Sequence, residues 1–213
     1  MSFNTAEWII RIAVLLFAVT IHEYAHGKAA LSLGDPTAKN AGRLTLNPIS
    51  HIDPIGAICL FLFNFGWAKP VPVNTRYFQN RRRDTILMAI SGPVSNISAA
   101  FVTGLFLRFY LIQVPIYQTL LIYMLLMNIG LGLFNLLPIP PLDGSHVLEN
   151  ILPPSASIRF RQMSRYAPFV LIGVLLLDNF LHMNILGRLL AYPILKIAHL
   201  FGGDNFYRLI GFL

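Results

Sequence analysis

The sequence predicts an all-α integral membrane protein with about four to five spans and one short β-hairpin loop that dips into the membrane. Composition is the first observation behind this prediction. Of the 213 residues, 55% are hydrophobic and only 12% are charged, whereas a soluble domain carries about 25% charged residues. Segment length is the second, because a spanning helix needs about 20 mostly apolar residues. Four segments meet or approach this length, namely 6–33, 85–110, 116–137 and 168–183, and the last is the shortest.

The segment 185–201 follows these four spans and is also apolar. It contains Arg188, Pro193, Lys196 and His199, which suit either a fifth, tilted span or an amphipathic helix at the membrane interface. We favour the interfacial helix. No internal repeat is visible, so we expect a single polytopic membrane domain, 1–213, in which residues 151–213 supply the C-terminal helices.

A long segment with both polar and apolar residues separates the first two spans. Residues 55–68 are apolar but too short to cross a membrane, and the Val-Pro alternation that follows suits an edge strand. Exposed strand edges are tolerated at membrane depth only against protein or water. We therefore interpret residues 42–78 as a loop that dips into the membrane and includes a short hairpin, with an ordinary surface loop as the alternative.

The N-terminal apolar run is interpreted as a retained membrane anchor. Residues 8–20 lead into a polar cluster without the small-residue cleavage site of a secretory signal peptide. The single cysteine, Cys59, excludes an intramolecular disulfide framework.

Basic residues between the spans predict the orientation, because cytoplasmic loops are enriched in Lys and Arg. Only Arg108 lies between the second and third spans, whereas both neighbouring loops are basic: Lys39, Arg43, Lys69, Arg76, Arg81, Arg82 and Arg83 in the first, and Arg159, Arg161 and Arg165 in the third. We expect these two loops in the cytoplasm and the N-terminus outside, in a bacterial cell membrane. The net charge of +7 then reflects topology and contact with anionic lipid, and we expect no nucleic-acid partner.

Within the first span, residues 22–26 read H-E-Y-A-H, the pattern H-E-x-x-H. Residues four apart lie on the same face of a helix, so His22 and His26 are expected to bind one metal ion side by side. Glu23 lies next to them and is expected to act as general base on a metal-bound water. Ionisable groups inside a span are expensive and indicate a functional site.

A catalytic zinc site normally has three protein ligands, so a third ligand must come from elsewhere in the chain. His22 lies about 24 Å along the first span at 1.5 Å per residue, near the expected cytoplasmic side. The third span ends on that side and leads into the segment that contains Asp143. Asp143 and His146, one turn later, remain alternatives; the other residues considered are Asp53, Glu149, Asp178, His51, His182 and His199.

Three motifs together resemble the site-2 protease family of zinc-dependent intramembrane proteases. They are H-E-x-x-H in the first span, "SGPVSN" at 91–96 in the second, and "LPIPPLDG" at 137–144 after the third. The resemblance covers residues 6–150 and implies a three-helix catalytic core. It implies one zinc per chain held by His22, His26 and Asp143, with Glu23 as catalytic base, and so favours Asp143 over His146. The chain resembles a compact member without PDZ or CBS domains.

Several further roles are expected from chemistry. The oxyanion of a cleaved peptide bond needs a hydrogen-bond donor, and Asn135 and Asn96 are the candidate amides, with helix–helix bonding as their alternative role. The strand expected at 69–73 is suited to pair with an unwound substrate helix. His51 is expected to be structural.

The leading function is a zinc endopeptidase that cuts transmembrane segments of single-span membrane proteins near the cytoplasmic side. Two alternatives remain: a membrane metal hydrolase of a non-peptide amphiphile, and a non-enzymatic metal-binding membrane protein. A carrier is expected to spread ionisable groups along a path across the membrane, whereas here they gather toward one side.

Overall fold

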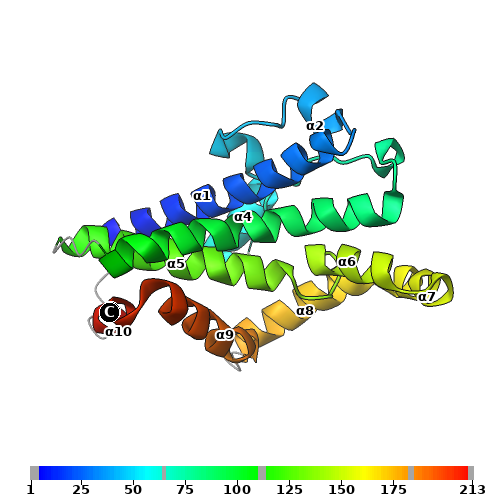
Figure 1. Cartoon of the computed structure of the whole chain (residues 1–213). Coiled ribbons are helices and arrows are strands. Elements are labelled where there is room, and N and C mark those ends of the chain that lie inside the picture. Colours follow the sequence, from blue (N-terminus) through cyan, green and yellow to red (C-terminus); the bar gives the residue numbers. More distant parts are fainter. Residues whose placement is uncertain (1–4, 64–65, 110–113, 182–184, 211–213) are drawn as a thin grey trace.

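Three long helices form the centre of the computed structural model, which describes residues 5–63, 66–109, 114–181 and 185–210 (Figure 1). They are α1 (Thr5–Ser32), α4 (Arg81–Phe109) and α5 (Pro115–Asn135), with 28, 29 and 21 residues. Each is long and apolar enough to cross a membrane. They coincide with the first three predicted spans, except that the end of the second, Tyr110, lies outside the described residues.

Small residues allow these helices to approach one another closely. Ala18 of α1, and Ala89 and Ala100 of α4, have no exposed surface. A side chain at Gly132 of α5 would come within 3.2 Å of the Pro93 carbonyl oxygen of α4. Small residues at helix contacts are the usual means of association inside a bilayer, where lipid tails remove the hydrophobic driving force between helices.

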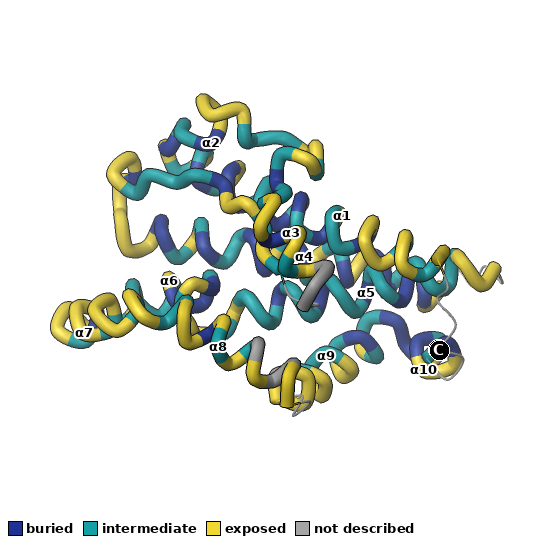
Figure 2. Tube along the Cα trace, turned by 180° about the vertical axis from the view of Figure 1, so that it is seen from behind, coloured by how far each residue is buried: buried dark blue, intermediate teal, exposed yellow. Residues whose placement is uncertain are grey.

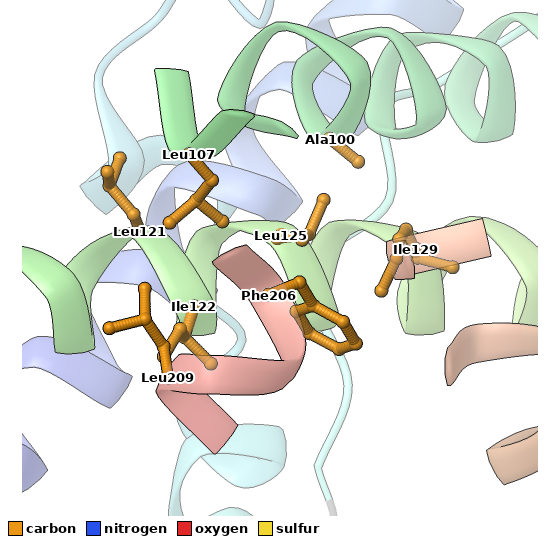
Figure 3. Packing of buried hydrophobic residues seen from close by; sticks show 9 residues of the cluster. Ala100, Leu107, Leu121, Ile122, Leu125, Ile129, Phe206 and Leu209 are labelled. Carbon is orange, nitrogen blue, oxygen red and sulfur yellow. The ribbon is translucent and has the colours of Figure 1, made fainter. Parts of the chain in front are cut away.

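An apolar cluster joins α4 and α5 to the C-terminal helices α9 (Ile185–Gly202) and α10 (Asp204–Ile210) (Figure 3). Its fully buried members include Leu125 and Phe206. The close approach of α9 depends on Gly104 of α4, where a Cβ would lie 2.5 Å from the Cβ of Phe201. The segment 185–201, expected to be an interfacial helix or a fifth span, forms α9 and packs against the bundle.

The remaining C-terminal helices are α6 (Asp143–Ile151), α7 (Pro154–Ser164) and α8 (Ala167–Phe180). The expected fourth span is represented by α8, which has 14 residues and is shorter than the roughly 20 that a crossing needs. The end of that expected span, 182–183, lies outside the described residues. Figure 2 shows buried positions where the three long helices meet and exposed ones along α7 and α8.

The region between α1 and α4 differs from the prediction. It contains the short helices α2 (Thr37–Asn40), η1 (Pro48–His51), α3 (Pro54–Phe63) and η2 (Thr75–Tyr77). The described residues form no strand here, only an isolated antiparallel bridge between Ile52 and Ala68. The expected β-hairpin is therefore wrong in its secondary structure.

The physical reason for this correction lies in the two arms of the region. The apolar residues after Pro54 satisfy their backbone within a helix, the structure that best suits an apolar environment. The returning arm contains Pro70 and Pro72, which have no N–H to donate to a sheet ladder. Gly56 of α3 packs against this arm, and a Cβ there would lie 2.1 Å from the Trp67 carbonyl oxygen.

Candidate metal centre

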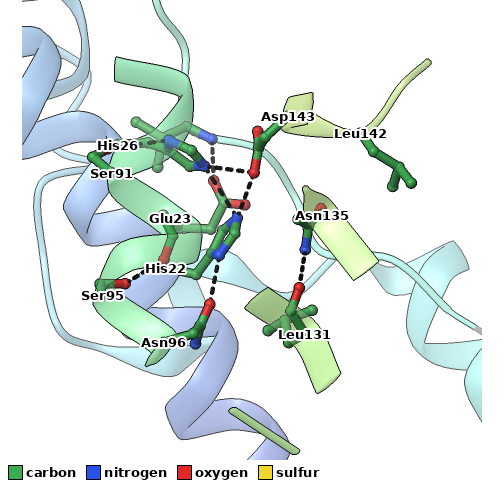
Figure 4. Close-up of polar contacts among 12 residues, drawn as sticks. His22, Glu23, His26, Ser91, Ser95, Asn96, Leu131, Asn135, Leu142 and Asp143 are labelled. Atoms are coloured by element: carbon green, nitrogen blue, oxygen red, sulfur yellow. Dashed lines mark hydrogen bonds and ion pairs between the residues drawn. The ribbon is translucent and has the colours of Figure 1, made fainter. Parts of the chain in front are cut away.

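His22 and His26 lie on one face of α1, toward the end that meets α2, and both are buried. Their Nε2 atoms are 3.0 Å apart. Asp143 Oδ2, from the first residue of α6, lies 3.1 Å from His22 Nε2 and 3.2 Å from His26 Nε2. Figure 4 shows the three side chains pointing toward one another. The structure thus brings the H-E-x-x-H pair and the L-D-G aspartate into one cluster.

The other nitrogen of each imidazole determines its tautomer. His26 Nδ1 lies 2.8 Å from the Met88 carbonyl oxygen, which only accepts hydrogen bonds. His22 Nδ1 lies 2.6 Å from Asn96 Oδ1, which also accepts. Both histidines therefore carry their proton on Nδ1 when neutral, and both Nε2 lone pairs point at the Asp143 carboxylate. Three electron-pair donors that converge in this way are suited to hold a cation between them.

The spacing of the cluster fits a tetrahedral metal ion. Ligand bonds of about 2.0 Å to zinc place neighbouring ligand atoms about 3.3 Å apart. The three separations of 3.0, 3.1 and 3.2 Å are close to this value. His22, His26 and Asp143 also form the group of possible metal ligands found among the described residues. Burial opposes ionisation of Asp143, but its hydrogen bonds with His22 and His26 outweigh burial and hold the pKa of this carboxyl below its usual value.

Two glycines make room for this cluster. A Cβ at Gly92 of α4 would lie 2.4 Å from His26 Nε2 and 2.7 Å from His22 Nε2. A Cβ at Gly144 would lie 2.2 Å from the Leu136 carbonyl oxygen at the end of α5. Gly92 therefore gives space to the imidazoles, and Gly144 lets α6 turn tightly against α5 so that Asp143 faces them.

A buried chain of amides supports His22 from behind. Asn96 Nδ2 donates to the Ala18 carbonyl oxygen and to Asn128 Oδ1, both at 2.9 Å. Asn128 Nδ2 in turn donates to the Met124 carbonyl oxygen at 2.8 Å. Asn96 and Asn128 have no exposed surface. Sequence reasoning missed Asn128; a lone amide within an apolar span was the only available signal.

The two amides expected to donate to the oxyanion differ in whether they have an unused N–H. Both amide hydrogens of Asn96 are used, so this residue holds His22 in place and has no hydrogen left for a substrate. Asn135 donates one hydrogen to the Leu131 carbonyl oxygen at 3.0 Å, as Figure 4 shows. Its second amide hydrogen has no partner among the described residues.

The carboxylate of Glu23 is held by the backbone of the returning arm. Val71 N–H donates to Glu23 Oε2 at 2.8 Å. Glu23 directly follows His22 on α1, and Figure 4 places its carboxylate beside the cluster. A carboxylate fixed next to a possible metal site is positioned to accept a proton there.

The other residues considered as ligands lie elsewhere. His146 is exposed on α6, and His51 is buried and donates from Nε2 to the Thr45 carbonyl oxygen. Asp53 accepts from the Gly56 N–H, and Glu149 pairs with Arg161. His199 lies beside Tyr207 of α10. His182 and the side chain of Asp178 lie outside the described parts of the chain.

Comparison with known proteins identifies the family. The family model described as peptidase family M50 matches residues 111–177. "Putative zinc metalloprotease YwhC" of Bacillus subtilis is 39% identical over 195 residues, which cover 87% of this chain and 85% of that protein. The chain belongs to peptidase family M50. The resemblance to the site-2 proteases is thereby confirmed, and the chain is a metallopeptidase.

Two further relatives are more distant. Both carry the name "Putative zinc metalloprotease Rip2". The protein of Mycolicibacterium smegmatis is 27% identical, over 80% of this chain and 67% of its own length. That of Mycobacterium tuberculosis strain H37Rv is 30% identical, over 80% and 66%. Zinc is the metal in all three names, and the His22, His26 and Asp143 cluster fits it. No solved structure gives a significant match.

Proposed function

We propose that this M50 peptidase hydrolyses peptide bonds within transmembrane segments of single-span membrane proteins. The observation that carries the proposal is the convergence of His22, His26 and Asp143 at 3.0–3.2 Å inside a bundle of helices long enough to cross a membrane. These three residues hold one zinc ion. A zinc site among spanning helices acts on a peptide that shares the bilayer.

The residues around the cluster divide the chemistry between them. A zinc ion held by His22, His26 and Asp143 would supply Lewis acidity and make water nucleophilic near neutral pH. Glu23 accepts the proton of the attacking water as general base and passes it to the leaving amine. The second amide hydrogen of Asn135 donates to the developing oxyanion. Asn96 keeps His22 in its Nδ1–H tautomer.

The substrate helix must unwind before its backbone reaches this site, because a helical peptide bond is enclosed by its own hydrogen bonds. The arm 69–74 offers a partner for the unwound strand, although it is not itself part of a sheet. Val73 N–H and the carbonyl groups of Pro72 and Val73 have no hydrogen-bond partner among the described residues. Main-chain pairing with them replaces the hydrogen bonds that the substrate loses.

The orientation follows from the ends of the bundle. The basic run Arg81–83 at the start of α4 lies at the same end as α2 and α7, as Figure 1 shows. The start of α1 and the C-terminal helix α10 lie at the other end. The basic end is cytoplasmic by the enrichment of Lys and Arg there. The N-terminus is then outside a bacterial cell membrane, and the metal centre is closer to the cytoplasm.

A comparison of substrates tests the proposal. Purified protein in lipid nanodiscs is mixed with a panel of single-span proteins, and with soluble peptides that carry the same cleaved sequences. Cleavage of embedded substrates, abolished by chelator and restored by zinc, is the expected result. Cleavage of the soluble peptides alone would contradict an intramembrane activity while leaving the metallopeptidase intact.

A further inference from the structure

Val71 N–H donates a hydrogen bond to Glu23 Oε2 at 2.8 Å. Val71 belongs to the segment 69–74, which is anchored to the rest of the protein at both ends. At the start of the segment, Lys69 N–H donates to the His51 carbonyl oxygen at 2.9 Å. The Arg43 guanidinium donates to the Lys69 carbonyl oxygen at 2.8 Å. These bonds fix the arm to η1 and to the loop that follows α2.

The end of the segment is held by a fully buried carboxylate. Asp35, which has no exposed surface, accepts from Asn74 N–H at 2.7 Å. Its other oxygen accepts from Thr37 N–H at 2.9 Å and from the Thr37 hydroxyl. A buried carboxylate with three donors is held firmly, because moving it would leave a charge without partners.

The middle of the segment is stiff and lies against α1. Pro70 and Pro72 flank Val71, and proline both fixes its own φ and restricts the preceding residue to extended conformations. Gly27 of α1 has no side chain, and a Cβ there would lie 3.2 Å from Val71 Cγ1. Val71 therefore reaches α1 one turn beyond Glu23, with a single donor aimed at the carboxylate.

We propose that the main-chain N–H of Val71 positions the general base, so that residues 69–74 serve two partners with alternate amides. Val71 donates to Glu23, and Val73 donates to the substrate strand. The two prolines separate these amides and remove every other donor between Lys69 and Asn74. The substrate half of this inference rests on the proposed function, whereas the bond to Glu23 does not.

Three substitutions separate the two amides in the full-length protein. Val71→Pro removes the donor to Glu23, Val73→Pro removes the donor to the substrate, and Val71→Ala keeps the N–H while shortening the side chain. Loss of one hydrogen bond to a charged group corresponds to roughly 10- to 100-fold. We expect Val71→Pro to lower kcat by this factor with KM near wild type, and Val73→Pro to raise KM instead. Val71→Ala is expected to recover most of the kcat that Val71→Pro loses.

Two further measurements, zinc content and amide hydrogen exchange, test the inference even if one of the proline variants misfolds. All three variants should retain zinc like the wild type. In metal-free protein labelled with ¹⁵N-valine, the Val71 amide should exchange at least about tenfold faster in Glu23→Ala than in wild type, with Val73 unchanged. Equal Val71 exchange in the two proteins would overturn the proposal. An equal loss of kcat in Val71→Ala and Val71→Pro would overturn it as well.

The exchange measurement needs no substrate, so the two proposals fail separately. If no membrane substrate is cleaved, the proposed function fails, and the Val71 exchange rate still decides the role of its N–H. If cleavage is observed and exchange is unaffected by Glu23→Ala, the protease function stands and the positioning role is wrong.

Discussion

The two ends of the same helix bundle are packed by opposite chemistry. Around His22 the contacts between α1, α4 and α5 are polar, with Asn96 and Asn128 fully buried. Toward the other end, α4 and α5 meet α9 and α10 through an apolar cluster that includes Leu125 and Phe206. Buried polar groups are costly unless every donor and acceptor is paired. We therefore expect the stability of the fold to depend mainly on the apolar end, and zinc binding and cleavage to depend mainly on the polar end.

Removal of a ligand at the polar end should have the largest effect. His22→Ala removes one of three ligand atoms, and Asp143→Asn replaces an anionic ligand oxygen with a neutral amide oxygen. We therefore expect zinc and cleavage to be lost in His22→Ala and both to fall strongly in Asp143→Asn. His146→Ala is the matched control, because His146 is exposed on the same helix as Asp143. Elemental analysis of the purified proteins measures the effect. Zinc lost from His146→Ala but kept in Asp143→Asn would move the third ligand one turn along α6.

Gly92→Ala should disturb the cluster almost as strongly without touching a ligand. The added Cβ would lie 2.4 Å from His26 Nε2, so an imidazole has to move away from the shared position. We expect zinc affinity and cleavage to fall by at least about 100-fold. Loss of a residue that only hydrogen-bonds a metal ligand typically lowers affinity by about 10- to 100-fold, and here a ligand itself is displaced. Gly173→Ala in α8, where a Cβ meets nothing within 4 Å, is the control. Similar zinc affinity in the two variants would contradict this account of Gly92.

The apolar end should respond in stability and not in metal binding. Leu125 has no exposed surface, and Leu→Ala in a packed core costs about 2–5 kcal/mol. We expect Leu125→Ala to lower the unfolding midpoint in detergent while zinc content stays near wild type. A loss of zinc at temperatures where the protein remains folded would break the proposed division between the two ends.

Asn128→Leu should give the smallest of these effects, because Asn128 contacts the metal ligands only through Asn96. The substitution leaves one Asn96 hydrogen without its partner, which weakens the hold on His22. We expect zinc affinity to fall by about 10- to 100-fold, measured by competition with a chelator of known affinity. Asn128→Gln, which keeps an amide, should recover part of the loss; equal affinity in wild type and Asn128→Leu would show that the amide chain is only structural.

The sequence was sufficient for features that depend on local geometry. Residues four apart share a helix face, so the pairing of His22 and His26 could be predicted from spacing alone. Apolar length predicted α1, α4 and α5 for the same reason. Asp143 required the family resemblance, because the residues alone left His146 open. In the structure Asp143 faces the imidazoles and His146 is exposed, a difference of less than one helical turn.

Features that depend on tertiary packing could not be predicted. The role of Asn128 arises only where α5 meets α4, since its partner is 32 positions away in sequence. The hairpin expected near residues 69–73 was wrong because valine–proline alternation has strand-like spacing but lacks the donors of a ladder. The same prolines leave Val71 N–H for Glu23, a contact between segments 48 positions apart that no local pattern indicates.

The most direct test of the central claim pairs zinc content with cleavage of an embedded substrate for Glu23→Gln. Glutamine keeps the size of the side chain and an oxygen for Val71 N–H, but it does not act as a base. The account predicts zinc near the wild-type level and a rate lower by about 10²- to 10⁴-fold. A Glu23→Gln protein that cleaves the substrate at the wild-type rate would contradict the mechanism.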